Sequence, residues 1–409
     1  MRILVLSQYF WPESFRINEL VSALHAKDVD VEVLTGQPNY PSGVIFEGYR
    51  SWGCGCEPFQ GMTVRRVPLV PRGNSRYQLS LNYLSFIVSA FVFGTWLLRK
   101  RQFDAVFIFG ASPILVAIPG IWFGWLKRCP TLLWVQDLWP ESLSATGYLT
   151  HPASLKALGH AIRWIYQKVD MLLVQSRAFI PKVRDLSGST PIIYYPNSFM
   201  EEDSGEISQS VPCQELEGGF PVVFAGNMGS AQALEVVLEA AALLRNFEGI
   251  RFVMVGDGSQ REWLMQQAMS QCLENIVFPG RYPIEAMPAL MAKAGALLVT
   301  LADTEIFRLT IPSKIQAYLA AGRPIIACLN GAGADIVSEA GAGITVPAGD
   351  ALALSEAIRT LYFMQESQRV ELGKRGRTYY QEHFSHDKLV DKLIDYFEEA
   401  VRSHKRATK

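Results

Sequence analysis

The chain has 409 residues, which is enough for two domains of ordinary size, each with its own hydrophobic core. Hydrophobic residues make up 49% and charged residues 19%, a composition that excludes a disordered chain. The formal net charge is only −1, and we do not expect nucleic acid as a partner. The six cysteines follow no repeating spacing and suggest reduced thiols in a cytosolic protein.

Short apolar runs alternate with longer helical segments through residues 1–200. The first run starts at Met1 and is too short for a signal peptide, so we expect a strand there. Alternation of this kind predicts a parallel sheet that is covered by helices on both faces. The expected strands are Ile3–Leu6, Val31–Leu34, Ala105–Phe109, Leu132–Val135, Met171–Val174 and Ile192–Tyr195.

The pattern breaks at residues 201–219, which are rich in Gly, Pro and acidic residues and are predicted to be a linker. A second strand–helix series occupies residues 220–385, and residues 386–409 have the spacing of a final amphipathic helix and tail. The strands expected in this series are Val222–Ala225, Phe252–Val255, Ile276–Phe278, Ala296–Thr300 and Pro324–Cys328. The predicted fold is therefore α/β, with two Rossmann-like, doubly wound parallel-sheet domains facing a cleft.

Glycine turns follow three strands of the second domain. Glycine lets backbone N–H groups approach a phosphate, although many strand–helix turns carry glycine for geometry alone. Three turns in series favour a nucleotide site. The residues that we assign to it are Gly226, Asn227, Gly229, Gly256, Gly258 and Arg281.

A further loop, Ile311-Pro312-Ser313-Lys314, leads into a short apolar helix that stops at Gly322. Ser313 is placed to cap this helix, and Lys314 puts an ammonium group beside its positive end. The helix N-terminus and the ammonium group are both positive, and the fold has no evident need to bring them together. This combination suits a bound diphosphate. The alternative is that Lys314 is an ordinary surface lysine.

The run from Phe224 to Ile326 resembles the donor-binding domain of the family 4 glycosyltransferases, the large retaining family of the GT-B fold. The likeness extends over nearly the whole chain once Val135–Glu141 and the opening Tyr9-Phe-Trp-Pro-Glu13 are included. Bacterial O-antigen and capsule enzymes, among them L-fucosamine (FucNAc) transferases, share this opening and the Pro-Ser-Lys loop. The resemblance implies transfer of a sugar, such as an N-acetylated deoxysugar, from a nucleotide diphosphate, UDP above all, without a cofactor.

The sequence departs from this family at its charged positions. Two glutamates that family members carry eight positions apart fall on Leu309 and Ala317. An Arg and a Lys that follow the first strand of the donor domain are replaced by Asn227 and the Ala231-Gln232 region. Lys314 and Arg308 must then neutralise more of the negative charge of the diphosphate.

In the first domain, Asp137 follows an expected central strand and is the candidate catalytic residue, placed to orient the sugar or shield positive charge. The alternative is a helix N-cap. Its neighbour Gln136 stands where many relatives have histidine. Glu13 and Arg16 match the region that contacts the acceptor in this family, or else belong to an ordinary surface loop. We predict no metal site, because no histidine pairs with a carboxylate at ligand spacing and Asp28-Val-Asp30 leads away from the cleft.

Residues 77–98 form a run of 22 uncharged residues between basic flanks. Nine Lys or Arg residues against one acidic residue lie between Gln60 and Pro130, and Trp122 and Trp125 precede Lys127-Arg128. A spanning helix is rejected, because the next strand belongs to the same sheet. A helix that docks on the inner face of the cell membrane fits better, with a buried core helix as the alternative. The expected acceptor is then a polyprenyl-diphosphate-linked saccharide.

Two other functions share these features. Nucleotide-sugar epimerases have the same two-domain architecture, but they need acid and base groups in the cleft and have no use for a basic, aromatic membrane face. A non-catalytic sugar-nucleotide binder would explain the missing glutamate pair. The balance of the motifs favours a glycosyltransferase.

Overall fold

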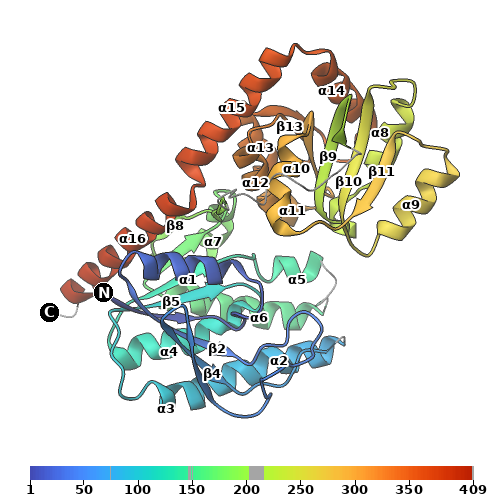
Figure 1. Cartoon of the computed structure of the whole chain (residues 1–409). Coiled ribbons are helices and arrows are strands. Elements are labelled where there is room, and N and C mark those ends of the chain that lie inside the picture. The colour runs from blue at the N-terminus through green and yellow to red at the C-terminus, as the bar shows by residue number, and fades with distance from the viewer. Residues whose placement is uncertain (74, 146–148, 150, 202–215, 408–409) are drawn as a thin grey trace. The chain divides into compact units, whose positions relative to one another are not determined.

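The computed structural model describes residues 1–73, 75–145, 149, 151–201 and 216–407 (Figure 1). The chain forms two compact units. The first consists of Met1–Pro196 together with Leu389–Lys409, and the second of Asn197–Lys388. Most of the predicted linker, residues 202–215, lies outside the described residues.

The first unit is built on an eight-stranded sheet with the order β3-β4-β2-β1-β5-β6-β7-β8. All neighbouring strands are parallel except β3, which runs antiparallel to β4 at one edge. The six expected strands are confirmed, and the β3–β4 hairpin was not foreseen. The strands are β1 Arg2–Leu6, β2 Asp30–Gly36, β3 Gly55–Phe59, β4 Met62–Val67, β5 Ala105–Gly110, β6 Thr131–Val135, β7 Met171–Val174 and β8 Ile192–Tyr194.

Helices cover both faces of this sheet (Figure 1). They are α1 Arg16–Ala26, α2 Arg76–Ser89, the π-helical turn η1 Ala90–Gly94, α3 Thr95–Leu97, the 3₁₀ turn η2 Ile114–Val116, α4 Ala117–Lys127, α5 Glu141–Ala145, α6 Pro152–Lys168, α7 Phe179–Ser187 and α16 His386–Ala407. The C-terminal helix α16 was predicted to be amphipathic, and its apolar face completes the core of the first unit. The Phe397 ring meets the Phe107 ring of β5 edge-on, with centroids 5.5 Å apart.

The second unit is built on a six-stranded, wholly parallel sheet with the order β11-β10-β9-β12-β13-β14. Its strands are β9 Phe220–Asn227, β10 Ile250–Asp257, β11 Ile276–Gly280, β12 Ala296–Thr300, β13 Ile325–Cys328 and β14 Gly343–Val346. Its helices are α8 Glu235–Leu243, α9 Arg261–Ser270, α10 Met287–Ala292, α11 Glu305–Leu309, α12 Ser313–Ala321, α13 Ala332–Glu339, α14 Ala351–Phe363 and α15 Glu366–His383, with 3₁₀ turns η5 Ser230–Gln232 and η6 Ile284–Ala286.

Each sheet has one point at which the direction of winding reverses. In the first unit this is between β1 and β5, and in the second between β9 and β12. The connections leaving the two strands at such a point turn to opposite sides, so the carboxyl ends flank a crevice where ligands bind. In the second unit β9 and β12 pair at Ala296–Val222 and Leu297–Val223, so the two strands separate before their carboxyl ends.

Candidate functional site

The end of β9 is shaped by two glycines that lie side by side on β9 and β10. Gly226 has a φ of 138°, and a Cβ atom there would lie 2.6 Å from Cε of Lys314. Its partner Gly256 has a φ of 127°, and a Cβ atom there would lie 2.0 Å from the Gly226 carbonyl oxygen. Only glycine fits at either position, because the backbone is left-handed and the neighbours are too close. The turn thus makes room for the side chain of Lys314.

Lys314 extends from the first turn of α12 across this turn. Its Nζ donates a hydrogen bond to Oε1 of Gln232 at 2.5 Å and lies 3.7 Å from the centre of the Phe224 ring. Burial lowers the pKa of Lys314 to about 7, and the ring face, which attracts a cation, opposes that shift. Within the described chain no carboxylate pairs with Lys314. A half-buried ammonium group without a counter-charge is suited to an anionic ligand.

The walls of the crevice are fixed by hydrogen bonds between side chains and the backbone. The Ala225 N–H donates to the Tyr318 hydroxyl at 2.9 Å. A side chain of α12 thus supplies the hydrogen-bond partner of a β9 backbone group at the point where β9 no longer pairs with β12. Thr300 Oγ1 donates to the Gln232 carbonyl at 2.6 Å and holds the partner of Lys314 in place. Sequence reasoning assigned no site role to Tyr318 or Gln232, because an aromatic residue on an apolar helix and a glutamine in a turn carry no distinctive signal.

The two arginines predicted to bind the donor are engaged elsewhere. Arg281 pairs with Asp257 at 3.1 Å, and both side chains are exposed. Arg308 donates two hydrogen bonds to Asp303 at 2.6 and 2.7 Å. The hydrogen bonds that Asp303 accepts from Arg308 and Asn330 lower the pKa of Asp303 to about 2. Lys314 is therefore the charge that the geometry leaves for a diphosphate, and donor contacts of the two arginines stay predictions.

The remaining predicted donor residues lie around the same turns. Asn227 is exposed at the end of β9, while Gly229 and Gly258 belong to the loops that follow β9 and β10. Ser313 is the exposed first residue of α12. The prediction that Ser313 caps this helix is wrong, because Pro312 occupies the N-cap and no side-chain cap forms.

In the first unit, a small hollow lies at the carboxyl ends of β1 and β5. Ser7, Gln8 and Tyr9 line it from the loop after β1, and Ser112 and Pro113 line it from the loop after β5. The hollow thus sits at the switch point of the sheet, where the strand order leads one to expect a ligand.

Asp137, in the loop after β6, is hydrogen-bonded to Ser112, which lines this hollow. Ser112 Oγ donates to Oδ2 of Asp137 at 3.0 Å, and Trp139 Nε1 donates to Ser112 Oγ at 3.3 Å. Burial raises the pKa of Asp137, partly offset by the Ser112 hydrogen bond. The alternative role as a helix N-cap is not supported, because the carboxylate bonds to Ser112 and α5 begins only at Glu141.

Glu13 is buried, and its carboxylate accepts hydrogen bonds from three backbone N–H groups. The donors are Asn39 and Tyr40, both at 2.7 Å, and Phe10 at 3.2 Å. These bonds tie the loop after β1 to the loop after β2, which is a structural role. Arg16 begins α1, and burial lowers its pKa. Direct contact of Glu13 or Arg16 with an acceptor stays a prediction.

The outer face of α2, η1 and α3 is apolar and exposed. Only 22% of the most apolar window of Tyr77–Leu97 is buried, so the alternative of a core helix is wrong. Exposed side chains recur every four residues at Leu84, Val88, Val92 and Trp96, and others lie between them. By length and composition alone this helix could also cross a membrane, which for a single helix is weak support.

Helix α4 continues this face through its aromatic residues. The ring centroids of Phe91 and Trp122 are 4.7 Å apart, and those of Trp122 and Trp125 are 4.9 Å apart. Arg99 lies over the Trp96 ring at 4.6 Å. We call the exposed residues of α2, η1, α3 and α4 the apolar face.

Part of the basic excess between Gln60 and Pro130 is neutralised within the fold. Arg65 and Arg101 pair with the buried Glu32, and Arg66 pairs with Glu57. Both acids lie earlier in the chain than the basic segment and were not counted with it. Exposed basic residues that remain beside the apolar face are Arg99, Lys100 and Arg128.

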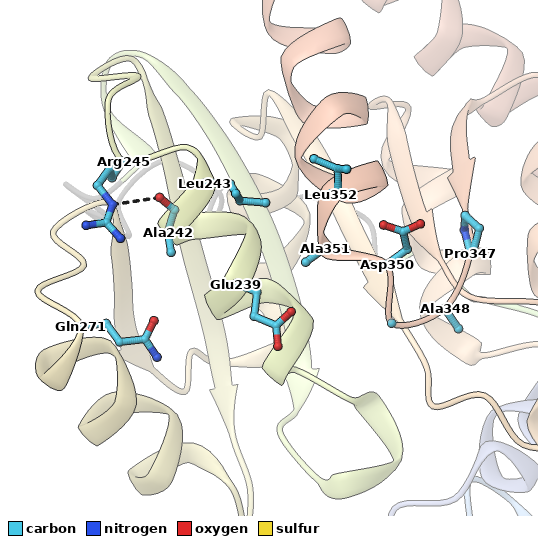
Figure 2. A pocket seen from close by; sticks show the side chains of 11 residues that line it. Glu239, Ala242, Leu243, Arg245, Gln271, Pro347, Ala348, Asp350, Ala351 and Leu352 are labelled. Atoms are coloured by element: carbon cyan, nitrogen blue, oxygen red, sulfur yellow. Dashed lines mark hydrogen bonds between the residues drawn. The ribbon is translucent and has the colours of Figure 1, made fainter.

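An open groove elsewhere on the second unit contains none of the predicted site residues. Figure 2 shows it between α8, the end of α9 and the start of α14, with Glu239 and Asp350 facing it. Arg245 at its rim is held by the Ala242 carbonyl at 2.9 Å. The described residues contain no cluster of three or more His, Cys, Asp or Glu side chains that could hold a metal ion.

Comparison with known proteins identifies the family. Residues 14–197 match the model of a glycosyl transferase 4-like domain, and residues 219–363 match the model of the glycosyl transferases group 1. The chain belongs to the group 1, or family 4, glycosyltransferases. It is an enzyme of the sugar-transferring class, as the sequence motifs predicted.

Two curated relatives cover most of the chain. A protein of Pseudomonas aeruginosa named as a glycosyltransferase, WbjE, is 26% identical over 324 residues, which are 77% of this chain and 79% of the relative. A protein of Escherichia coli K12 named as a colanic acid biosynthesis glycosyl transferase, WcaI, is 28% identical over 338 residues, 79% of this chain and 82% of the relative.

Solved structures show the same fold. Anabaena Alr3699/HepE in complex with UDP has a TM-score of 0.71 at 14% identity, over 98% of this chain and all of that one. WaaG, a glycosyltransferase involved in lipopolysaccharide biosynthesis, has a TM-score of 0.63 at 15% identity, over 97% and 99%. The prediction of two Rossmann-like domains in the GT-B fold is confirmed.

Proposed function

We propose that this glycosyltransferase moves a sugar from a UDP-sugar to a lipid-linked saccharide in the assembly of a bacterial surface polysaccharide. The observation that carries the proposal is the ammonium group of Lys314, half-buried at the switch point of the second sheet, where none of the described carboxylates pairs with it. UDP is supported by HepE, which was solved with UDP and with UDP-glucose. Surface polysaccharide is supported by WcaI, named for colanic acid biosynthesis.

The chemistry assigned to the second unit is stabilisation of the leaving diphosphate. As the bond to the anomeric carbon breaks, negative charge grows on the phosphate oxygens. The first turn of α12 has no side-chain N-cap, which leaves backbone N–H groups available to an anion, and Lys314 in the same turn adds positive charge when a bound diphosphate holds the proton on its amine. Fixed groups that are aimed at a developing charge lower the barrier without reorganising during the reaction.

The role assigned to the first unit is to position the sugar and the acceptor. Asp137 is the group that orients the transferred sugar, or shields positive charge at its anomeric carbon, with Ser112 holding the carboxylate. Retention of anomeric configuration follows from membership of family 4. An N-acetylated deoxysugar as the donor sugar is part of the proposal and rests on the resemblance of the opening Tyr9–Glu13 and the Pro-Ser-Lys loop.

The acceptor is proposed to be held in the membrane by a polyprenyl diphosphate. The apolar face supports this, because water-exposed Leu, Val, Phe and Trp side chains beside Arg99 and Lys100 match an anionic lipid surface. The enzyme would then work in the cytoplasm, attached peripherally to the inner face of the cell membrane.

The test is to measure nucleotide release from UDP-sugars with and without a polyprenyl-linked saccharide. A transferase releases UDP in proportion to the glycosylated lipid. An epimerase changes the sugar without needing an acceptor, and a non-catalytic binder releases nothing. Either of the latter results, with a panel of UDP-hexoses and UDP-N-acetylaminosugars, rules the proposal out.

A further inference from the structure

We propose that Gln8 binds a hydroxyl group of the acceptor saccharide and that Asn82, inside the helix that carries the apolar face, is the residue that positions it. The inference rests on the proposed function, because it assigns the acceptor to the hollow of the first unit. It adds a binding residue and a positioning residue that none of the sequence motifs singled out.

Asn82 is a fully buried polar residue in the middle of α2, a helix that carries no charged residue after Arg76 at its start. Its Nδ2 donates to the Val70 carbonyl at 2.7 Å and to Oδ1 of Asn39 at 3.4 Å. Its Oδ1 accepts from Nε2 of Gln8 at 2.8 Å and from the Tyr9 hydroxyl at 3.2 Å. The amide thereby uses both donors and both lone pairs, and it joins α2 to the loops after β1, β2 and β4.

The orientation of the Gln8 amide follows from this network. The Val70 carbonyl can only accept a hydrogen bond, so Asn82 must turn its N–H toward it. The side-chain oxygen of Asn82 then faces Gln8, so Gln8 must donate a hydrogen bond to it from its own side-chain N–H. The oxygen of Gln8 is left over. It is buried in the wall of the hollow and makes no hydrogen bond to any described residue.

A buried carbonyl oxygen without a donor destabilises the fold, so its presence calls for a partner that the protein itself does not supply. A carbonyl oxygen accepts hydrogen bonds and repels anions, which favours a sugar hydroxyl over a phosphate as its partner. Ser112, which holds Asp137, lines the same hollow. The hydroxyl would therefore lie beside the group proposed to act on the transferred sugar.

The helix has opposite faces for these two tasks. Asn82, Ser85 and Phe86 point inward, whereas Leu84 and Val88 are exposed on the apolar face. A helix that rests on the bilayer through its outer face fixes the height of the Gln8 loop above the lipid. This arrangement suits an acceptor whose sugar is tethered to the membrane at a set distance.

The experiment compares Gln8→Met, Asn82→Leu and the double variant in the full-length protein, with a polyprenyl-linked saccharide on anionic vesicles. Ser85→Ala is the matched control. Ser85 lies three residues further along the inner face; its hydroxyl accepts from the Val70 N–H at 2.9 Å and donates to the Asn82 backbone carbonyl at 2.8 Å, but it does not bond to the Asn82 amide group that holds Gln8. Kinetic constants are measured separately for donor and acceptor.

Each single variant should lower kcat/KM for the acceptor roughly 3- to 10-fold, the loss expected for one neutral hydrogen bond. The KM for the donor and the binding to vesicles should not change. Because Asn82 acts through Gln8, the double variant should be no worse than the poorer single variant. Ser85→Ala should lower the melting temperature without moving the acceptor constants.

An unchanged kcat/KM for the acceptor in Gln8→Met overturns the inference, and it decides the matter even if Asn82→Leu does not fold. Additive losses in the double variant overturn the link between the two residues. If the wild type transfers sugar to the lipid-linked acceptor while Gln8→Met is normal, only this inference fails. If the wild type transfers nothing to it, the proposed function fails as well.

Discussion

Replacing Lys314 by methionine should separate the charge of its ammonium group from the packing of its stem. Methionine retains an unbranched apolar side chain that can lie against Phe224, next to Gly226. It removes the hydrogen bond to Gln232 and the positive charge. A charge-assisted hydrogen bond contributes about 1.5–3 kcal/mol, so the dissociation constant for UDP should rise roughly 10- to 150-fold.

The affinity of the wild type should also depend on pH, with a direction set by the burial of Lys314. The pKa of Lys314 in the free protein is lowered to about 7, whereas a bound diphosphate holds the proton on the amine. Above pH 7, binding must then take up a proton. The dissociation constant for a UDP-sugar should rise by up to about tenfold per pH unit between pH 7 and 9 and be level below pH 7. Lys314→Met should remove this dependence.

The assay is isothermal titration calorimetry with a UDP-sugar in buffers of different ionisation enthalpy, which reports the proton taken up. Lys293→Met is the control, because Lys293 is an exposed lysine of the same unit whose loss removes the same net charge. Its affinity should stay within about twofold of the wild type. Unchanged affinity in Lys314→Met, or a pH profile equal to that of the wild type, would refute the assignment of Lys314 to the diphosphate.

The same residue should affect stability in the absence of ligand. Between about pH 7 and the ordinary lysine value of 10.5, the unfolded chain binds more protons at this site than the folded chain. The free energy of unfolding should therefore rise with pH across this window, by up to about 1.4 kcal/mol per pH unit from this group. Urea titrations should give a shallower rise in Lys314→Met. An equal slope would assign the dependence to other groups.

Three further predictions concern the reaction and the membrane. Asp137→Asn should lower kcat about 100-fold or more with UDP affinity unchanged. Wild-type activity should fall as the pH drops through the raised pKa of Asp137. Equal kcat in the wild type and in Asp137→Asn would contradict a role of Asp137 on the transferred sugar. Leu84→Asp with Val88→Asp should abolish co-sedimentation with anionic vesicles, whereas Met269→Asp, at a still more exposed apolar position of the second unit, should not. Retention of the double variant on vesicles would exclude this face. Transfer should continue in EDTA, and activity that is lost there and restored by Mg²⁺ or Mn²⁺ would refute a metal-independent mechanism.

The strands that sequence reasoning found share a simple property. They are runs such as Ala105–Gly110 and Thr131–Val135, whose side chains are buried on both faces of a parallel sheet and are therefore apolar throughout. The β3–β4 hairpin was missed because β4 carries Arg65 and Arg66. These arginines can be buried only because Glu32 and Glu57 pair with them. The sequence of β4 by itself does not show that such partners will lie beside it.

The candidate site was predicted in part for a similar reason. Glycines such as Gly226 carry a local signal, because the chain needs them for its own backbone geometry. The state of a charged side chain depends instead on what the fold places next to it. Lys314 and, after it, Arg308 were assigned to the diphosphate from the sequence, yet Arg308 pairs with Asp303, whereas the contacts of Lys314 among the described residues are Gln232 and the Phe224 ring.

The buried polar residues of α2 show how the fold reconciles two demands on one helix. An apolar outer face would ordinarily turn inward and bury itself, which is the hydrophobic preference of any soluble domain. Asn82 and Ser85 oppose this rotation, because turning them outward would break the hydrogen bonds to Val70 and Gln8 and leave those groups buried and unpaired. The hydrogen-bond network thus keeps the apolar face exposed, and it does so with the residues that shape the acceptor hollow. In Asn82→Leu the Ser85 hydroxyl still accepts from the Val70 N–H, so the helix should keep its outer face exposed and vesicle binding should be unchanged, while the Gln8 amide loses the group that orients it.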